Sequence, residues 1–209
     1  MAHLRKPLAM AVALNTGITV VETLAGLRAN SLSLVMDGIH NLSDELALVL
    51  LLLAVLQSRP ARRLVQAANG FNSIGLVVVS VLPLWHAVHR LAHPQPVVGV
   101  VPIVVGLLAA LGNWGVAEVL KKPAQTEPAI RLAYVHNRGD ALVSLAPAVA
   151  GLGVMVLRTP LVDPLVALGT GLAILVPTLH TLVSARQELL WPEGLSCGPA
   201  DSHTMEVSS

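Results

Sequence analysis

Residues 32–56 read LSLVMDGIHNLSDELALVLLLLAVL, an almost continuous apolar run broken by a few polar side chains. A run of about 20 apolar residues is the length of an α-helix that crosses a membrane. His40 and Asp44 lie inside it, and Asp44 stands about 17 Å along the helix axis, near the middle of a bilayer. Ionisable side chains at that depth cost at least about 2.5 kcal/mol each on insertion scales, so a partner, cavity or function must hold them. This stretch predicts a membrane helix with a polar site.

The composition of the whole chain also indicates a membrane protein. Of its 209 residues, 54% are hydrophobic and only 12% are charged, whereas soluble domains are about 25% charged. The net charge of +1 and the aromatic content of 2% leave no basic face or stacking platform, so no nucleic-acid partner is expected. The single cysteine, Cys197, excludes a disulfide framework and a cysteine-rich metal site.

The apolar stretches are long enough to predict six transmembrane helices. They cover residues 7–27, 32–56, 68–91, 97–120, 129–157 and 160–184. Prolines inside these spans are tolerated in membrane helices, where they can introduce kinks. They are Pro83, Pro102, Pro147 and Pro177. The predicted fold class is therefore an all-α membrane protein.

The distribution of basic residues predicts the orientation. Loops on one side carry Arg5, Lys6, Arg59, Arg62, Arg63, Lys121, Lys122, Arg131 and Arg186. The other side carries only Arg28, Arg90 and Arg158. Because basic loops stay inside, both termini are expected in the cytoplasm. Residues 1–190 are interpreted as a transmembrane transport domain and residues 191–209 as a disordered cytoplasmic tail, rich in Gly, Pro and Ser.

A short sequence repeat relates the two halves of the chain. His40-Asn41-Leu42-Ser43-Asp44 in the second span is echoed by His136-Asn137-Arg138-Gly139-Asp140 in the fifth. With three helices in each half, the two copies should run in opposite directions through the membrane. Two inverted three-helix halves are typical of secondary transporters.

The repeated motif points to metal chemistry. A spacing of four residues puts His40 and Asp44 on one helix face, and likewise His136 and Asp140. If the second and fifth helices face each other, two imidazoles and two carboxylates form a four-ligand site that suits tetrahedral Zn²⁺. The simpler interpretation is that each pair is an intrahelical hydrogen bond that neutralises a buried polar residue. Because matching pairs occur at matching depths, we favour the metal site.

These motifs also resemble those of a known family. Asn30-Ser31-Leu32-Ser33-Leu34 and Met36-Asp37-Gly38-Ile39-His40-Asn41-Leu42-Ser43-Asp44 resemble the second-helix motif of the cation diffusion facilitators, and His136 to Asp140 resembles their fifth-helix motif. The resemblance extends over about residues 8–192. It implies a zinc-type member with His40, Asp44, His136 and Asp140 as transport-site ligands.

The resemblance also implies a function and a location. Members of this family export divalent cations from the cytoplasm in exchange for protons, and they work as homodimers. The cytoplasmic domain that usually follows the sixth helix is not expected here, so a homodimer would have to form through transmembrane helices. The absence of a long His-rich loop between the fourth and fifth helices suggests a prokaryotic inner-membrane protein.

Other polar residues in the spans have two interpretations each. Arg138 should point away from the metal site, and it either snorkels to the inner interface or pairs with a carboxylate such as Glu22 or Glu45. A second group of residues either orients the ligands or links helices. It comprises Asn15, Asp37, Asn41 and Asn137.

Several histidines lie outside the repeated motif. His86, His89 and His93 share a helix face near the outer end of the third span, where they either collect metal or are ordinary interfacial residues. His180, near the inner end of the sixth span, has no obvious partner. In the tail, Cys197, Asp201 and His203 could touch metal, but a solvated tail is favoured.

Two alternatives to transport use the same ligands. An intramembrane metalloenzyme needs an open metal position and a general base, for which only Glu45 is a candidate, so we do not expect an enzyme. A metal-sensing or accessory membrane subunit remains open. The preferred interpretation is a proton-coupled zinc exporter of the lipid bilayer.

Overall fold

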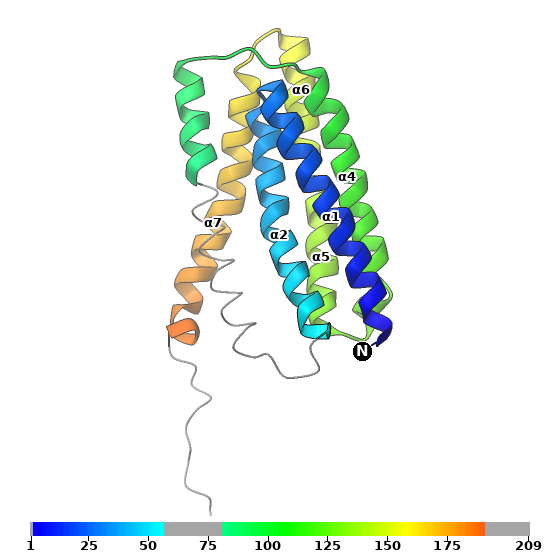
Figure 1. Cartoon of the computed structure of the whole chain (residues 1–209). Helices are drawn as coiled ribbons and strands as arrows, with labels where there is room; N and C mark the ends of the chain where they lie inside the picture. Colours follow the sequence, from blue (N-terminus) through cyan, green and yellow to red (C-terminus); the bar gives the residue numbers. More distant parts are fainter. Residues whose placement is uncertain (1, 57–80, 191–209) are drawn as a thin grey trace, which may run out of the picture.

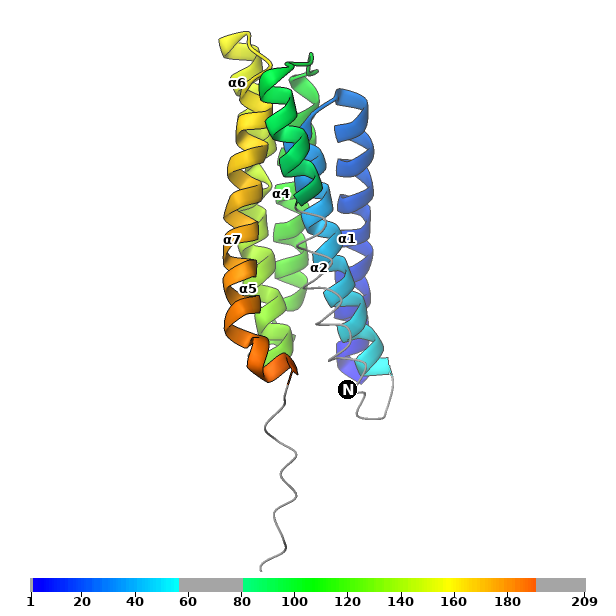
Figure 2. The same ribbon diagram turned by 90° about the vertical axis from the view of Figure 1, so that its left-hand side faces the viewer.

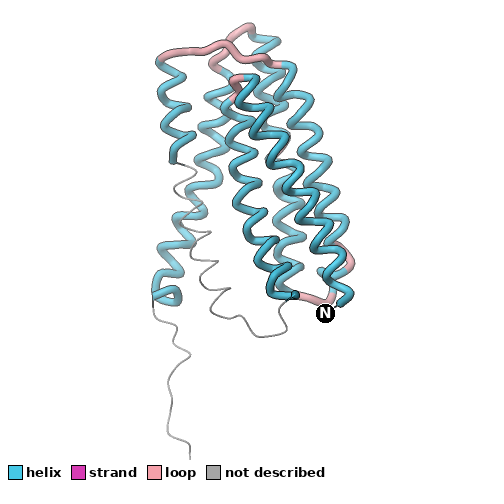
Figure 3. The backbone as a smooth tube through the Cα atoms, in the orientation of Figure 1, coloured by secondary structure: helices cyan, strands magenta, loops and turns pink. Residues whose placement is uncertain are grey.

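The computed structural model describes residues 2–56 and 81–190, and within these ranges every regular element is helical. The elements are α1 (Ala2–Ala29), α2 (Leu32–Leu56), a helical segment at residues 81–92, α4 (Val100–Leu120), the short 3-10 helix η1 (Pro123–Gln125), α5 (Pro128–Val143), α6 (Leu145–Leu157) and α7 (Val162–Leu190). Figure 3 shows these helices joined by short loops. The predicted all-α class is confirmed.

The helices stand side by side in one elongated bundle, as two views at right angles show (Figures 1 and 2). The chain begins at one end of the bundle, and α1 runs from there to the opposite end. α2 runs back, whereas α5 followed by α6 runs in the same direction as α1. The helices that carry the two copies of the repeated motif are therefore antiparallel, as the inverted repeat predicts.

Most predicted spans agree with helices of the structure except at their ends. The windows 7–27, 32–56, 97–120 and 160–184 correspond to α1, α2, α4 and α7. Of the third window, 68–91, only the part from residue 81 lies within the described residues, and it is helical. The apolar pattern thus located these elements correctly.

The fifth predicted span is found as one apolar stretch long enough to cross a membrane, Ala133–Leu157, and its helix is interrupted near Pro147, where the sequence allows a kink. The chain forms α5 and α6 with an interruption at Ser144. The physical reason is Pro147, which has no N–H to donate and whose ring collides with the carbonyl group four residues earlier, at Val143. The break lies one turn beyond Asp140, so it alters the backbone directly next to the repeated motif.

A buried carboxylate from α7 accepts hydrogen bonds at the N-terminus of α2. Asp163 is fully buried and accepts hydrogen bonds from the backbone N–H of Leu32 at 2.6 Å, the hydroxyl of Ser31 at 2.6 Å and the hydroxyl of Ser33 at 2.5 Å. The first N–H groups of a helix have no intrahelical acceptor, so this contact satisfies them from another helix. The connection before it is tight because Asn30 adopts a left-handed conformation with φ of 57°, which asparagine tolerates.

The outer surface of the bundle is apolar, as a lipid environment requires. Leu111 and Leu142 are 69% and 72% exposed. In the part of the chain that the structure describes, Leu4–Ala29, Val100–Leu120 and Ala133–Leu157 are long and apolar enough to cross a membrane, and Val162–Val176 is a shorter apolar stretch. The protein is therefore a multi-pass membrane protein.

α1 and α2 cross closely at Gly38. A Cβ atom at this position would lie 2.8 Å from the hydroxyl oxygen of Thr23 and 3.0 Å from its backbone nitrogen. Small residues allow membrane helices to approach in this way. Gly38 lies between Asp37 and His40 in the sequence, so the crossing holds the polar stretch of α2 against α1.

We predict that Gly38→Ala lowers the thermal unfolding temperature in detergent, because overpacking typically costs about 1–3 kcal/mol. Gly17→Ala on α1 is the matched control, since a Cβ atom there meets nothing within 4 Å. It should leave the unfolding temperature unchanged or raise it, because alanine is favoured over glycine in a helix by about 1 kcal/mol. Equal unfolding temperatures for the two variants would contradict the close crossing.

Candidate metal centre

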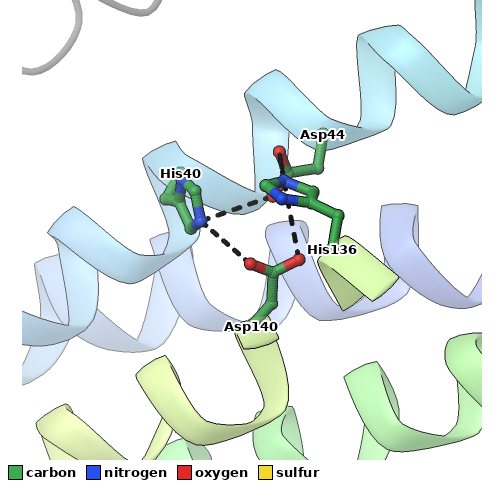
Figure 4. Close-up of side chains that lie close together, drawn as sticks. All are labelled: His40, Asp44, His136 and Asp140. Atoms are coloured by element: carbon green, nitrogen blue, oxygen red, sulfur yellow. Dashed lines mark hydrogen bonds and ion pairs between the residues drawn. The ribbon is translucent and has the colours of Figure 1, made fainter. Parts of the chain in front are cut away.

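α2 and α5 bring the four residues of the repeated motif together. His40 and Asp44 come from α2, and His136 and Asp140 come from α5. One nitrogen or oxygen atom from each side chain lies within 4.8 Å of the corresponding atoms of the other three. Figure 4 shows both imidazole rings directed at the carboxylates.

The shortest contacts run between the helices. His40 Nε2 lies 3.2 Å from Asp140 Oδ1 but 3.6 Å from Asp44 Oδ2 on its own helix. His136 Nε2 lies 2.7 Å from Asp44 Oδ1 but 3.7 Å from Asp140 Oδ2. The interpretation as two separate intrahelical pairs is therefore wrong, because each histidine is closest to the aspartate of the other helix (Figure 4).

The separations of these atoms fit a small tetrahedral cation. Zn²⁺ binds nitrogen and oxygen ligands at about 2.1 Å, and tetrahedral geometry then holds the ligand atoms about 3.4 Å apart. The histidine–aspartate separations of 3.2, 3.6, 2.7 and 3.7 Å involve both oxygens of each aspartate, and one atom from each residue lies within 4.8 Å of the others. A bound ion would draw one oxygen of each aspartate and the two imidazole nitrogens to the tetrahedral spacing and would replace the hydrogen bonds between them. Two carboxylates also balance the charge of a divalent ion.

The four side chains differ in their access to the surroundings. His40, Asp44 and Asp140 are buried, whereas 49% of the His136 side chain is exposed. Buried oxygens Asp44 Oδ2 and Asp140 Oδ2 have no hydrogen-bond partner. The site therefore offers two unpaired acceptor atoms, and His136 is its most accessible member.

An apolar cluster closes the bundle between this site and the end where the chain begins. It contains Leu4, Leu8, Ala11, Leu48, Val116, Leu120, Ala124 and Ile130. Leu48 lies one helical turn beyond Asp44, and Ile130 lies six residues before His136. In this conformation, buried apolar residues of α1, α2, α4 and α5 therefore pack between the site and that end of the bundle.

On the other side of the site, a buried hydrogen-bond network joins α1, α2 and α4 to Ser144. Asn15 Nδ2 donates to the backbone carbonyl of Asn41 at 2.9 Å. Asn41 Nδ2 donates to Glu22 Oε2 at 2.6 Å. Asn113 Nδ2 donates to Asn41 Oδ1 at 3.2 Å and to the Ser144 hydroxyl at 3.0 Å. The repeated motif pointed to neither Asn113 nor Ser144, since a lone polar residue in an apolar span has no distinctive spacing.

The predicted orienting residues do not bind the four ligands directly. Asn15 and Asn41 link helices, and Asn137 Nδ2 donates to the carbonyl of Ala133 on its own helix at 2.9 Å. Asp37 is buried, and no hydrogen bond connects it to a ligand in the described residues. The interpretation as interhelical links is supported for Asn15 and Asn41.

Arg138 points away from the site, as its position on α5 predicts. Its guanidinium lies 5.5 Å from the centre of the Trp114 ring and 5.8 Å from that of Tyr134, and it donates to the Tyr134 hydroxyl at 3.1 Å. The proposed pairing with Glu22 or Glu45 is wrong, because the guanidinium contacts Tyr134 and Trp114 instead. A pocket that Arg138 shares with Lys121 supports snorkelling towards that end of α4.

The remaining histidines do not form a second centre within the described residues. The rings of His89 and His93 stack at 4.7 Å, whereas His86 lines a separate, largely apolar pocket beside Arg90. His180 on α7 is exposed. The tail with Cys197, Asp201 and His203 lies outside the described residues.

Comparison with known proteins identifies the family to which the chain belongs. Residues 8–190 match the family model described as the cation efflux transmembrane domain. The zinc transporter ZitB of Escherichia coli (strain K12) is 30% identical over 190 residues, which are 86% of this chain and 61% of the relative. The cadmium, cobalt and zinc/H(+)-K(+) antiporter of Bacillus subtilis (strain 168) is 25% identical, over 82% of this chain and 58% of the relative.

A third relative, the cation efflux system protein CzcD of Alcaligenes sp. (strain CT14), is 28% identical over 97% of this chain and 65% of its own length. The chain thus spans about three fifths of the curated relatives that it matches. The family model, in contrast, covers most of the chain and includes both copies of the repeated motif. The chain belongs to the cation efflux family.

Proposed function

We propose that this protein is a secondary active transporter that exports zinc, or a similar divalent transition-metal cation, from the cytoplasm in exchange for protons. The observation that carries this proposal is the convergence of two imidazoles and two carboxylates from antiparallel helices within 4.8 Å. The names of the relatives, a zinc transporter and a cadmium, cobalt and zinc antiporter, support the same substrate class. His40, Asp44, His136 and Asp140 are the proposed ligands of the transported ion.

The distribution of basic residues also supports a cellular location and a membrane orientation for the protein. We assign residues 1–190 to the transport domain of a bacterial inner membrane, with both termini in the cytoplasm, because basic residues favour that side. Residues 191–209 are assigned to a cytoplasmic tail. A homodimer through transmembrane helices is proposed from the family resemblance.

Proton exchange follows from the chemistry of the ligands. Zn²⁺ requires neutral imidazoles and ionised carboxylates, so protons and metal compete for the same groups. Alternating access also requires that the apolar cluster around Leu48 opens when the site faces the cytoplasm. In the described conformation the residues of the cluster are packed together and buried, which favours a state without cytoplasmic access under the proposed orientation.

The two alternatives to transport are a metalloenzyme and a metal-sensing or accessory subunit. A metalloenzyme needs a general base, and the candidate Glu45 instead accepts a 2.6 Å hydrogen bond from the hydroxyl of Thr16. A metal-sensing or accessory subunit would use the same four ligands as a transporter. Zinc flux into proteoliposomes that contain only this protein separates the two, because a sensor does not move the ion.

We predict that Asp44→Ala and Asp140→Ala each abolish zinc uptake into proteoliposomes, measured with an internal zinc-sensitive dye. Each change removes one of four ligands and one of the two negative charges that balance the ion. Glu118→Ala is the control, since this exposed carboxylate pairs with Lys121 and forms no hydrogen bond or ion pair with the four proposed ligands among the described residues. Full flux in either aspartate variant would disprove the assignment of the site.

Proton coupling is tested by imposing pH gradients on the same vesicles. A proton gradient directed into the cytoplasmic side should drive zinc out, because imidazole ordinarily titrates near about pH 6.5 and neutral histidine is needed to bind metal. A protonophore should abolish the zinc export that the proton gradient drives. Zinc flux that responds to neither treatment would reject exchange.

Metal selectivity is expected to depend on His40. Imidazole favours Zn²⁺ over Mg²⁺ and Ca²⁺, which prefer oxygen-rich shells. His40→Asp replaces a nitrogen ligand by oxygen and should raise cadmium transport relative to zinc, as competition assays can measure. An unchanged or lower cadmium-to-zinc ratio would show that selectivity lies elsewhere.

A further inference from the structure

A second pair of acidic residues lies next to the metal centre and is not part of it. Glu22 on α1 and Asp37 on α2 are 0% and 1% exposed, and their carboxyl groups act on each other electrostatically across the contact between the two helices. Neither forms a hydrogen bond or ion pair with the four proposed ligands in the described residues. The close crossing of α1 and α2 at Gly38 holds the pair together, because a Cβ atom there would lie 3.1 Å from Glu22 Cβ.

The surroundings do not balance two negative charges. Asn41 donates one hydrogen bond to Glu22 Oε2, and Ser144 at the start of α6 is near Asp37. α4 presents no charged group to Glu22: the cavity of about 190 Å³ that Glu22 borders is otherwise lined by apolar residues. The titratable groups of α2 and α5 whose charge acts on Asp37 are His40 and Asp140, and neither forms a hydrogen bond or ion pair with it among the described residues.

As two carboxylates, the pair would leave buried acceptor atoms without donors. Glu22 Oε1 and both oxygens of Asp37 have no hydrogen-bond partner. Unpaired buried charges are strongly unfavourable, and two adjacent carboxylates cannot easily both ionise. One proton on either carboxyl group creates a donor, joins the two groups and removes one charge.

The position of the pair couples it to the metal centre. Asp37 lies three residues before His40 on α2, a rise of about 4.5 Å, and Asn41 contacts Glu22 from the position directly after His40. A divalent cation at the centre places positive charge beside the pair. Positive charge favours the ionised form of nearby carboxyl groups.

We propose that Glu22 and Asp37 share one proton in the metal-free protein and release it when a divalent cation binds at the neighbouring centre. The proton leaves one carboxyl group as H⁺, and the pair becomes two carboxylates beside the bound cation. This inference rests on the proposed function as a proton-coupled transporter. It adds a proton site that is separate from the metal ligands.

The test counts protons released by the purified full chain when Zn²⁺ binds. Isothermal titration of zinc in buffers of different ionisation enthalpy gives this number directly. Glu22→Gln and Asp37→Asn should each release about one proton fewer per zinc ion than the unaltered protein, because an amide donates permanently to the remaining carboxylate. The double variant should also lose about one and not two, since the pair shares a single proton.

Glu45→Gln is the matched control. Glu45 is also buried, but its carboxyl group accepts from the Thr16 hydroxyl and forms no hydrogen bond with a second carboxyl group among the described residues, so its replacement should leave the proton count unchanged. An equal loss in this variant, or an additive loss in the double variant, overturns the proposal.

Infrared spectroscopy of the unaltered protein tests the same proton without a variant. Zinc addition should remove a protonated carboxyl band, and an unchanged band overturns the proposal. If added K⁺ weakens zinc binding in the unaltered protein but not in Glu22→Gln, the pair holds a monovalent cation and the proposal is wrong.

The outcomes also separate this inference from the proposed function. Zinc binding and proton-driven flux with an unchanged proton count in Glu22→Gln would refute only the shared proton. A protein that neither binds nor transports zinc, in contrast, would refute the transport function itself.

Discussion

The structure depends on the cost of placing ionisable groups inside a bilayer. Four such groups are neutralised by contacts between α2 and α5, and the closest pairs, His136 with Asp44 and His40 with Asp140, join the two helices. Neither helix could satisfy its own polar residues as well alone, since the intrahelical separations are longer. This mutual dependence holds the antiparallel helices in register at one depth.

Other helices support α2 through polar contacts at defined points. Asn15 of α1 donates to the backbone beside His40, and Asn113 of α4 donates to the Asn41 side chain. Asp163 of α7 fastens the first turn of α2. Because polar contacts between membrane helices are directional, these bonds orient α2 around its own axis and direct His40 and Asp44 towards α5.

Much of this architecture could be predicted from the sequence, because apolar runs locate membrane helices and a spacing of four puts two residues on one face. The repeated His-x-x-x-Asp motif therefore identified all four residues that the structure brings together. The crosswise pairing could not be predicted, since distances between helices are not encoded in the spacing within a helix. The same limit applies to Asn113 and Asp163, whose partners lie far away in the sequence. The exact position of the break, Ser144, could not be predicted either, because the sequence does not show at which residue the helix accommodates Pro147.

The two sides of the centre differ chemically: an apolar cluster around Leu48 on one side, and buried carboxyl and amide groups around Asn41 on the other. In the proposed cycle, the apolar side has to open for a hydrated cation, and the polar side carries the proton that Glu22 and Asp37 share before the ion binds.

X-ray absorption at the zinc edge of the zinc-loaded protein identifies the ligands of the bound ion. Two imidazole nitrogens and two carboxylate oxygens are expected at about 2.0–2.2 Å. Sulfur scattering, which would implicate Cys197, or a six-oxygen shell would contradict this set of ligands.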